Sequence, residues 1–376
     1  MKILLTGGGT GGHFYPLIAI AEKLIENADK QKIIDLKLYY MSDSPYDKRL
    51  LFENKITYIQ VPAGKMRTYS SISNFFDIFK TAIGAFFGLL NMFFVYPDVV
   101  ISKGGYAAFP AVLAARLLKI PVIIHESDSY PGRVNVWTAK FAWHVAISWP
   151  ETAEYLPKEK IALTGQPIRK EILKGDMNGA HEFFKLDFNL PTLLILGGSQ
   201  GAQIINDIIV DTLPELLSRY QIIHQTGTNN IEEVSARAKL LMENNPNISR
   251  YVPIPYLNNL ATRMAAGCAT LVISRAGSSI FEIASWGIPS IIIPITNSNG
   301  NHQMKNAYNY ARTGACEVIE EANLSQHLLV AEIDRIISSS AKITKMKEAA
   351  NSFASPEAAD KIAKSAIDLA WTHEEQ

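Results

Sequence analysis

The sequence is poor in cysteine and has no excess of either charge. Its 376 residues include only two cysteines, Cys268 and Cys316. Two cysteines form neither a disulfide framework nor a zinc site, which favours a reducing compartment. The 36 Lys and Arg residues equal the 36 Asp and Glu residues, so the charge does not indicate a surface for nucleic acid.

Signals for export, nucleoside triphosphate binding and metal binding are also missing. Ile3-Leu4-Leu5 is the only apolar run before the first glycines and is too short for a signal peptide, so we expect a cytoplasmic protein. No Lys-Ser or Lys-Thr follows those glycines, which excludes a P-loop. The chain has no obvious Asp-x-Asp pair, so we expect neither a metal nor another cofactor.

Glycines follow the first predicted strand. Gly7, Gly9 and Gly12 satisfy the G-x-G-x-x-G pattern of dinucleotide-binding folds, and an apolar helix is predicted after them. Asp43, after the next strand, is the candidate ribose-binding acid of that pattern. An NAD(P)-dependent oxidoreductase is therefore one alternative function. His13 stands at the helix start, where the helix dipole lowers an imidazole pKa and favours the neutral form. It is a candidate base or a space-filling residue.

The same strand and loop pattern occurs twice in the chain. Residues 97–126 and 269–295 each read apolar strand, Ile-Ser-basic, glycine turn, helix, Ile-Pro and apolar strand. Residues 2–12 and 192–202 are similar in the same way. The repeated order predicts an α/β protein of two doubly wound, Rossmann-like domains, with glycine loops facing each other across a cleft.

The domain boundaries follow from this pattern. We predict an N-terminal domain over 1–164 and a C-terminal domain over 165–345. The last segment, 346–376, carries an apolar helical stripe that we expect to cross back to the N-terminal domain. Arg169 follows the predicted linker and is either a phosphate ligand or an ordinary surface residue.

The stretch 271–309 carries the densest set of polar candidates. Ser279 and Glu282 have the spacing of a capping box, so a helix is predicted to begin there and to stop at Gly287. Gln303 and Asn306 lie in the polar segment that follows. We interpret the stretch as a nucleotide-sugar site, with Glu282 on ribose hydroxyls and the helix start on phosphate. A capping glutamate and a polar loop are the alternative.

Residues 73–96 form the most hydrophobic segment, with phenylalanines at helical spacing. The uncharged span is shorter than the roughly 20 residues that a membrane crossing needs, and it contains glycines. We therefore expect either a buried helix or a patch resting on a membrane surface, with Lys65, Arg67 and Lys80 near anionic lipid. Ile78, Phe86 and Met92 are expected to be exposed.

Five motifs resemble the MurG family of peptidoglycan glycosyltransferases along essentially the whole chain. They are GGTGGHFYP (8–16), SKGGYAAFP (102–110), GGSQGA (197–202), SRAG (274–277) and HQMKNA (302–307). The resemblance implies the GT-B fold. It also implies inverting transfer of GlcNAc from UDP-GlcNAc to the 4-hydroxyl of MurNAc in a lipid-linked muramyl-pentapeptide, at the cytoplasmic membrane face. A non-catalytic UDP-sugar-binding protein is an alternative from outside enzymology.

The resemblance also implies roles for individual residues. The catalytic candidates are His13 and Glu126, and the acceptor-side residues are Gly104, Gly105 and Tyr106. The donor-binding candidates are Thr10, Gly11, Gly12, Asp128, Asn135, Arg169, Ser199, Leu257, Ser278, Glu282, Gln303 and Asn306. Leu257, or else Ile254, is expected to hold uracil through its backbone.

The chain departs from the family pattern in three places. His125-Glu126-Ser127-Asp128 replaces the family's His-Glu-Gln-Asn, so Asp128 stands where a donor-contacting asparagine is expected. The stretch from Gly277 to Glu282 is one residue shorter than in many members, which affects the contacts expected of Ser278. The segment before Ala269 is slightly longer, which leaves the choice between Leu257 and Ile254 open.

Overall fold

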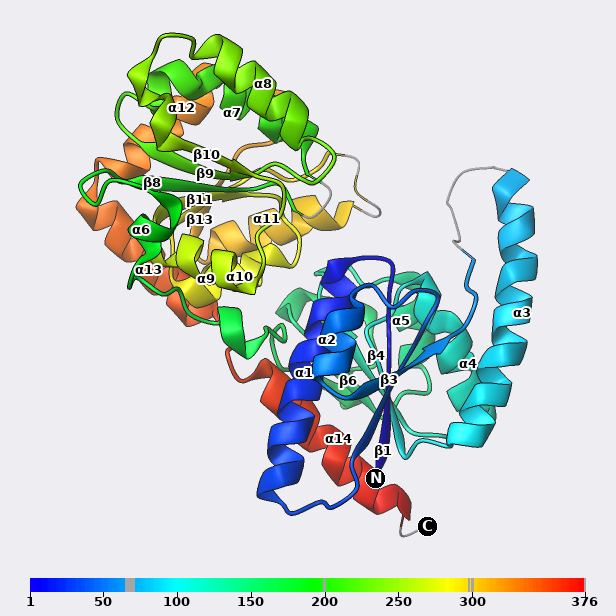
Figure 1. The fold of residues 1–376 in the computed structure, drawn as a ribbon. Helices are drawn as coiled ribbons and strands as arrows, with labels where there is room; N and C mark the ends of the chain where they lie inside the picture. Colours follow the sequence, from blue (N-terminus) through cyan, green and yellow to red (C-terminus); the bar gives the residue numbers. More distant parts are fainter. Residues whose placement is uncertain (65–71, 199–200, 297, 299–300, 375–376) are drawn as a thin grey trace. The chain divides into compact units, whose positions relative to one another are not determined.

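The computed structural model of the chain describes residues 1–64, 72–198, 201–296, 298 and 301–374. The chain divides into two compact units (Figure 1). Unit 1 combines Met1–Lys170 with Ser355–Gln376, and unit 2 is Glu171–Ala354. These limits lie later in the chain than the expected boundaries after residues 164 and 345.

Unit 1 is built on a seven-stranded parallel sheet in the order β3-β2-β1-β4-β5-β6-β7. Its strands are β1 (Lys2–Thr6), β2 (Lys37–Ser42), β3 (Ile56–Gln60), β4 (Val99–Ser102), β5 (Val122–Glu126), β6 (His144–Ile147) and β7 (Ile161–Leu163). Its helices are α1 (Gly11–Lys30), α2 (Lys48–Glu53), α3 (Ile72–Val95), α4 (Phe109–Leu117), α5 (Arg133–Ala139) and α14 (Ala358–Glu374).

The central strand β1 is covered on both faces because successive side chains point to opposite sides of a sheet. Ile3 and Leu5 belong to a buried cluster with residues of α1 and α14. Leu4, between them, belongs to a second cluster with residues of α4 and α5. This burial explains why β1 is apolar at three consecutive positions. Parallel strands that lie between two layers of helices are usually apolar on both faces.

Unit 2 repeats this arrangement with a six-stranded parallel sheet in the order β10-β9-β8-β11-β12-β13. Its strands are β8 (Thr192–Leu196), β9 (Gln221–Gln225), β10 (Tyr251–Ile254), β11 (Ala269–Ser274), β12 (Ser290–Ile292) and β13 (Cys316–Val318). Its helices are α6 (Ala180–Phe184), α7 (Gln203–Leu216), α8 (Ile231–Leu241), α9 (Asn259–Cys268), α10 (Ser279–Trp286), α11 (His302–Arg312), α12 (Gln326–Ile337) and α13 (Ser340–Phe353).

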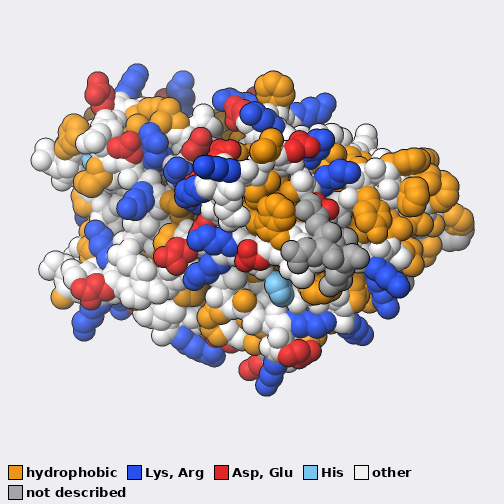
Figure 2. All heavy atoms as spheres, turned by 90° about the horizontal axis from the view of Figure 1, so that it is seen from below, with side chains coloured by type: hydrophobic (Ala, Val, Ile, Leu, Met, Phe, Trp, Pro, Cys, Tyr) orange, Lys and Arg blue, Asp and Glu red, His pale blue; other side chains and the backbone are white. Residues whose placement is uncertain are grey.

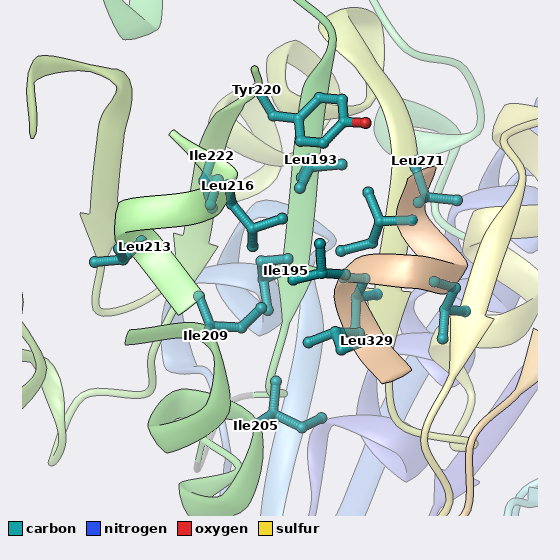
Figure 3. Close-up of a cluster of buried hydrophobic side chains, with 14 of the residues drawn as sticks. Leu193, Ile195, Ile205, Ile209, Leu213, Leu216, Tyr220, Ile222, Leu271 and Leu329 are labelled. Carbon is teal, nitrogen blue, oxygen red and sulfur yellow. The ribbon is translucent and has the colours of Figure 1, made fainter. Parts of the chain in front are cut away.

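The core of unit 2 is an aliphatic layer between its sheet and the helices α7 and α12 (Figure 3). Leu193 and Ile195 of β8 pack with Ile209 and Leu213 of α7, and Leu329 of α12 closes the layer. All five side chains are fully buried. The two sheets together confirm the predicted fold class of doubly wound α/β domains.

Helix α3 begins and ends close to the predicted limits, and it packs against the rest of unit 1 through a stripe of small residues. Gly84 and Gly88 are buried, together with Met92, and Cβ atoms built on the two glycines would contact Pro62 and Pro110. The expected exposure of Met92 is therefore wrong, because it shares the narrow glycine stripe against which α4 packs. Of the two alternatives for this segment, a fully buried helix is wrong, because most of the phenylalanine side chains are exposed.

The phenylalanine face of α3 is instead exposed (Figure 2). The exposed side chains are Ile78, Phe79, Ile83, Phe86, Phe87, Leu90, Phe93 and Phe94. Within the described residues, Asp77–Val95 is the one stretch long and apolar enough to cross a membrane by length and composition, and 17% of it is buried. Lys65 and Arg67 lie outside the described residues.

The end of the chain returns to unit 1 as α14 alone, since α13 belongs to unit 2. Ile362, Ala366, Ile367 and Ala370 of α14 pack into the cluster that contains Ile3 and the apolar face of α1. Asn27 of α1 donates to Asp360 of α14 at 2.9 Å. The apolar stripe of the last helix is thus covered by the first helix of the chain.

Candidate active site

The predicted residues of unit 1 gather at the carboxyl edge of its sheet, around the neighbouring strands β1 and β4. Strand order reverses between these strands, and the register pairs Thr6 with Ser102. Crevices at this switch point are where open α/β sheets bind ligands. The loops after β1, β4 and β5 therefore bring His13, Gly104 and Glu126 to one edge.

The first glycine loop leads directly into α1. Thr10 is the N-cap residue, and its carbonyl accepts from the backbone N–H groups of His13 and Phe14. Gly11 and Gly12 are the first two residues of the helix, so their N–H groups lie at its positive end. Backbone donors at such an end attract phosphate.

His13 is held at this helix start in a form suited to accept a proton. Its Nδ1 lies 3.3 Å from Thr10 Oγ1. Burial first, and the Lys103 charge second, lower the pKa of His13 to about 4, against the opposing effect of Asp128. The imidazole is therefore neutral at pH 7, which is the state a general base requires.

The residues predicted to lie on the acceptor side form a tight turn after β4. Gly104 and Gly105 both have positive φ, at 77° and 80°. A Cβ on Gly104 would lie 2.5 Å from Asn135 Oδ1, so both backbone conformation and space require glycine here. Tyr106 donates from its hydroxyl to Asp43 Oδ2 at 2.9 Å, so Asp43 contributes to the shape of this loop.

Glu126 is a buried carboxylate with three N–H donors. It accepts from the backbone N–H groups of Asp128 at 3.0 Å and Gly132 at 2.9 Å, and from Asn135 Nδ2 at 2.9 Å. Burial raises the pKa of Glu126, and the Asp128 charge adds to this effect. Glu126 thus closes the turn 126–132 and fixes both Asp128 and Asn135, two predicted donor ligands.

Lys103 lies within the SKGGYAAFP motif but is not among the candidate residues that the sequence predicts. It is 2% exposed, and its Nζ has no hydrogen-bond acceptor among the described residues. Burial lowers the pKa of Lys103 to about 8, against the opposing charges of Glu126 and Asp128. The signal that could have revealed it is a lysine between a buried strand and a glycine turn.

Arg169 belongs to unit 1 and is buried rather than an ordinary surface residue. Its guanidinium carbon lies 3.9 Å from the centre of the Tyr15 ring. Tyr15 is in the first turns of α1, so the arginine charge is held near the helix start.

The predicted residues of unit 2 form a second group. Leu257 is buried, its N–H donates to Gln225 Oε1 at 3.2 Å, and its carbonyl accepts from Thr262 Oγ1 at 3.3 Å. The Leu257 backbone is therefore fixed by two side chains. Ser199 lies outside the described residues.

The predicted capping box at the start of α10 is wrong. Ser278, not Ser279, is the N-cap residue, and its side chain makes no capping bond. Ser279 is the first helical residue, and its hydroxyl bonds Ser274 Oγ at 3.1 Å and the Arg275 carbonyl at 3.4 Å. Glu282 lies in the first turn, half-buried. The helix does end at Gly287, in a left-handed conformation, as predicted.

Gln303 and Asn306 connect α11 to the neighbouring loops. Gln303 Oε1 accepts from the backbone N–H of Ile295 at 3.1 Å, and Asn306 Nδ2 donates to the Ala276 carbonyl at 3.1 Å. Asn306 is 1% exposed. These bonds place α11 beside the loop that precedes α10.

An ion pair missed from the sequence supports the same region. Arg275 pairs with Glu321 at 2.6 Å and donates to the Ile293 carbonyl at 3.0 Å. Thr296 donates to Glu321 from both its N–H and its hydroxyl, each at 3.1 Å. Arg275 belongs to the SRAG motif. Glu321 lies far from it in sequence, and no sequence pattern predicts that the two residues pair.

Among the described residues no group of three or more His, Cys, Asp or Glu side chains is arranged to hold a metal ion. The chemistry available in unit 1 consists of a neutral imidazole, a buried carboxyl group, a buried ammonium, a guanidinium and helix-terminal N–H groups. This set can remove a proton from a hydroxyl and stabilise phosphate charge.

Both units match family models of one class of enzyme. Residues 3–147 match the model described as Glycosyltransferase family 28 N-terminal domain. Residues 192–362 match the model described as Glycosyltransferase family 28 C-terminal domain. The fold and these matches define a two-domain glycosyltransferase.

Curated relatives identify the family within that class. A UDP-N-acetylglucosamine--N-acetylmuramyl-(pentapeptide) pyrophosphoryl-undecaprenol N-acetylglucosamine transferase from Thermodesulfovibrio yellowstonii is 37% identical over 381 residues, covering 98% of this chain and 99% of the relative. A transferase of the same name from Clostridium novyi is 34% identical, covering 92% of each chain. The chain belongs to this family of transferases, the MurG family, as its motifs predicted.

Solved structures agree with the fold. MurG of Acinetobacter baumannii has a TM-score of 0.72 at 24% identity, covering 98% of this chain and 99% of that one. A UDP-GlcNAc 2-epimerase from Neisseria meningitidis bound to UDP-GlcNAc has a TM-score of 0.68 at 16% identity, covering 98% and 100%. At these identities the likeness concerns the fold alone. The comparisons give no support to the oxidoreductase alternative, and Asp43 is engaged with Tyr106.

Proposed function

We propose that this enzyme transfers GlcNAc from UDP-GlcNAc to the 4-hydroxyl of MurNAc in undecaprenyl-pyrophosphoryl-MurNAc-pentapeptide, with inversion and without a metal ion. The names of relatives that match nearly the whole chain support the substrates. The observation that supports the chemistry is the neutral His13 at the start of α1.

In the proposed step His13 accepts the proton of the acceptor hydroxyl. The hydroxyl oxygen forms a bond to C1 of GlcNAc while the bond from C1 to the diphosphate oxygen breaks, and UDP leaves. A positioned base of this kind contributes about 10²–10⁴-fold to a rate. N–H groups at the helix starts and the buried Arg169 would stabilise the departing diphosphate. Glu126 is the second candidate base.

The donor is proposed to bind through residues of unit 2. In this proposal Glu282 binds ribose, and Gln303 and Asn306 hold sugar hydroxyls. Gln303 and Asn306 each make one side-chain hydrogen bond to loop backbone. These bonds fix the two side chains, which supports the proposal that their other amide atoms bind the sugar.

The experiment that tests the function measures UDP release from several UDP-sugars, with and without a muramyl-pyrophosphoryl lipid. We expect release with UDP-GlcNAc only when the lipid is present. His13→Ala should lower turnover by about 10²–10⁴-fold with little change in donor affinity. Unchanged turnover at saturating substrate would remove His13 from the mechanism and favour Glu126. Release that never depends on the lipid would contradict the proposed acceptor.

The exposed face of α3 supports a second part of the proposal, peripheral association with the cytoplasmic face of the plasma membrane. Phe86 and Phe94 are 60% and 80% exposed. A continuous apolar patch of this kind marks a membrane or protein contact. The opposite face of α3 packs against α4 through Gly84 and Gly88, which favours a helix lying on the membrane surface while it stays attached to unit 1.

Vesicle co-sedimentation tests this association. Binding should increase with anionic lipid and weaken in the double variant Phe86→Ser/Phe94→Ser. Phe52→Ser is the matched control, because Phe52 is also in unit 1, on α2, and is 84% exposed. Equal binding by both variants, or no binding by the wild type, would place the membrane contact elsewhere.

A further inference from the structure

Asp43 has no role in the proposed chemistry, although the glycine pattern singles it out as a candidate ribose-binding acid. In the structure it follows β2, and its Oδ2 accepts from the Tyr106 hydroxyl at 2.9 Å. Its Oδ1 accepts from Ser42 Oγ at 3.4 Å. Burial first, and the bond to Asp43 second, raise the pKa of Tyr106 to about 12, so the phenol keeps its proton and is the donor. Asp43 therefore connects the end of β2 to the turn after β4.

This bond passes over the first glycine loop, because β2 and β4 pair with β1 from opposite sides. A Cβ built on Gly9 would lie 3.0 Å from Tyr106 Cε1, so the tyrosine ring packs against the loop. A Cβ on Gly8 would lie 2.5 Å from Ser42 Oγ and 2.9 Å from Ala107 Cβ. The first glycine loop is thus enclosed between the two segments that the bond joins.

A second bond ties the same loop to β2. Tyr40 of β2 is buried, and its hydroxyl donates to the Gly7 carbonyl at 2.8 Å. The end of β2 therefore holds both loops: it binds the first glycine loop through Tyr40 and the turn after β4 through Asp43.

The turn that Asp43 holds is in contact with the His13 ring. A Cβ on Gly105 would lie 3.4 Å from His13 Cε1 and 3.6 Å from His13 Nδ1. Gly105 directly precedes Tyr106, so a displacement of Tyr106 would move the backbone that packs on the imidazole. A misplacement of about 1 Å in a catalytic site can cost about 100-fold in rate.

We propose that Asp43 is a positioning residue for sugar transfer: its hydrogen bond from the Tyr106 hydroxyl holds the turn after β4 over the first glycine loop and against the ring of His13. The proposal rests on the proposed function in one respect, the role of His13 as base. Asp43 acts through Tyr106 and touches neither substrate.

Asp43→Ala tests the proposal, because alanine removes the hydrogen-bond acceptor. UDP release at varied concentrations of the lipid acceptor should show kcat/KM lowered by about 10–100-fold, mainly through kcat, with UDP affinity unchanged. Asp43→Asn keeps a side-chain oxygen that can accept from Tyr106, so it should recover most of the lost activity. Weaker UDP binding in Asp43→Ala would overturn the proposal and make Asp43 a ribose ligand.

A double-mutant cycle with Tyr106→Phe tests whether Asp43 acts through the Tyr106 hydroxyl. Phenylalanine keeps the ring and breaks the same bond from the other side, so this variant also serves if Asp43→Ala folds poorly. Adding Asp43→Ala to Tyr106→Phe should cost at most about a further twofold in kcat/KM, because side chains that act through one contact are not additive. Two losses that multiply in full would contradict the proposal.

Asp47→Ala is the matched control, since Asp47 is an acid of the same segment with a purely local partner set. Its carboxylate accepts from the backbone N–H groups of Arg49 and Leu50 at the start of α2. Asp47→Ala should lower the melting temperature and leave kcat/KM for the lipid acceptor unchanged. An equal loss of kcat/KM in this variant would make Asp43 a structural residue only.

A readout that needs no activity separates this inference from the proposed function. NMR of the full-length protein with ¹³Cζ-labelled tyrosine gives one resonance for Tyr106, identified by its loss in Tyr106→Phe. That resonance should move in Asp43→Ala and stay in place in Asp47→Ala. If it moves while kcat/KM is unchanged, or if it does not move at all, the positioning role of Asp43 is overturned. If the wild type releases no UDP with the lipid acceptor, the proposed function fails, whatever the resonance shows.

Discussion

At the scale of single residues, the partners of a side chain decide which role it can take. Glu126 satisfies its carboxylate with three N–H donors from the turn that follows it. His13 has a hydroxyl 3.3 Å from Nδ1 and a pKa of about 4. The Glu126 carboxylate is suited to holding its turn in place. The neutral His13 imidazole is suited to accepting a proton. This contrast favours His13 as the base.

The first prediction at this scale concerns Glu282. If it binds the ribose hydroxyls, Glu282→Gln should weaken UDP binding by about 1.5–3 kcal/mol, because a hydrogen bond to a charged group is lost. Isothermal titration with UDP measures this, and thermal melting should show nearly unchanged stability. The matched control is Glu348→Gln, an exposed acid on α13 of the same unit. Early melting with normal UDP affinity would make Glu282 only a helix-stabilising residue.

A second prediction at this scale concerns buried His224 in unit 2. Its Nδ1 lies 2.8 Å from Tyr251 Oη, and its Nε2 lies 3.0 Å from Asn206 Oδ1. Asn206 donates its Nδ2 to the Thr226 carbonyl, so its Oδ1 accepts from Nε2–H and leaves Nδ1 to accept from Tyr251. Burial lowers the pKa of His224 to about 3.

The sign of the pH effect follows from that lowered pKa. Between about pH 6.5 and 3 the unfolded chain protonates His224 while the folded protein does not, so stability is complete above this window and is lost as the pH falls through it. The slope contributed by this residue reaches about 1.4 kcal/mol per pH unit. Urea unfolding at several pH values should show a shallower dependence in His224→Gln. Equal slopes in the variant and the wild type would contradict the assignment.

At the scale of secondary-structure elements, packing partners decide which face of a helix is buried. Helix α3 is apolar on most sides, so its sequence periodicity alone could not identify the buried face. The structure buries the stripe of Gly84, Gly88 and Met92, because the small residues let α3 approach α4 and the segment around Pro62. The phenylalanines remain on the outside, where they form the proposed membrane contact.

The glycine stripe yields a prediction about α3. Glycine to alanine within a helix usually stabilises by roughly 1 kcal/mol. At Gly84, however, the new Cβ would lie 1.8 Å from the Pro62 carbonyl oxygen, and backbone cannot move aside cheaply. Gly84→Ala should therefore destabilise the protein by about 1–3 kcal/mol in urea unfolding.

Gly88→Ala is the graded control for that prediction, since its nearest contact would be 3.2 Å, to the Pro110 carbonyl oxygen. We expect it to cost clearly less than Gly84→Ala. If Gly84→Ala stabilises the protein as an ordinary helix substitution does, α3 does not pack along this stripe.

Elements with strong local signals could be predicted from the sequence, whereas features that depend on distant partners could not. The strand β1, its glycine loop and the end of α10 at Gly287 follow from short apolar runs and glycine. The capping box failed because Ser279 bonds back to Ser274 and Arg275, an alternative that the spacing cannot reveal. The family motifs supplied most candidate site residues. Lys103 was missed because its importance lies in burial without a bonded partner.

At the scale of the whole molecule, the chain closes on itself through α14. This helix comes last in the sequence, yet its apolar stripe completes the core built around β1 and α1. Residues 1–170 and 355–376 form one unit, while unit 2 lies between them in sequence. We therefore expect the stability of the first helix to depend on residues more than three hundred positions away.

Ile367→Ala tests this dependence. Ile367 is fully buried in the cluster with Leu17 and Leu24 of α1, so removing three carbons should cost about 2–5 kcal/mol. Hydrogen exchange should then accelerate in α1 and leave α7 unchanged, because exchange reports the local stability of each cooperative unit. Ile333→Ala is the matched control: Ile333 is equally buried, but in the core of unit 2 with α7. Its effect should appear in α7 and spare α1. If Ile367→Ala instead accelerates exchange in α7 and leaves α1 protected, α14 does not complete the first unit.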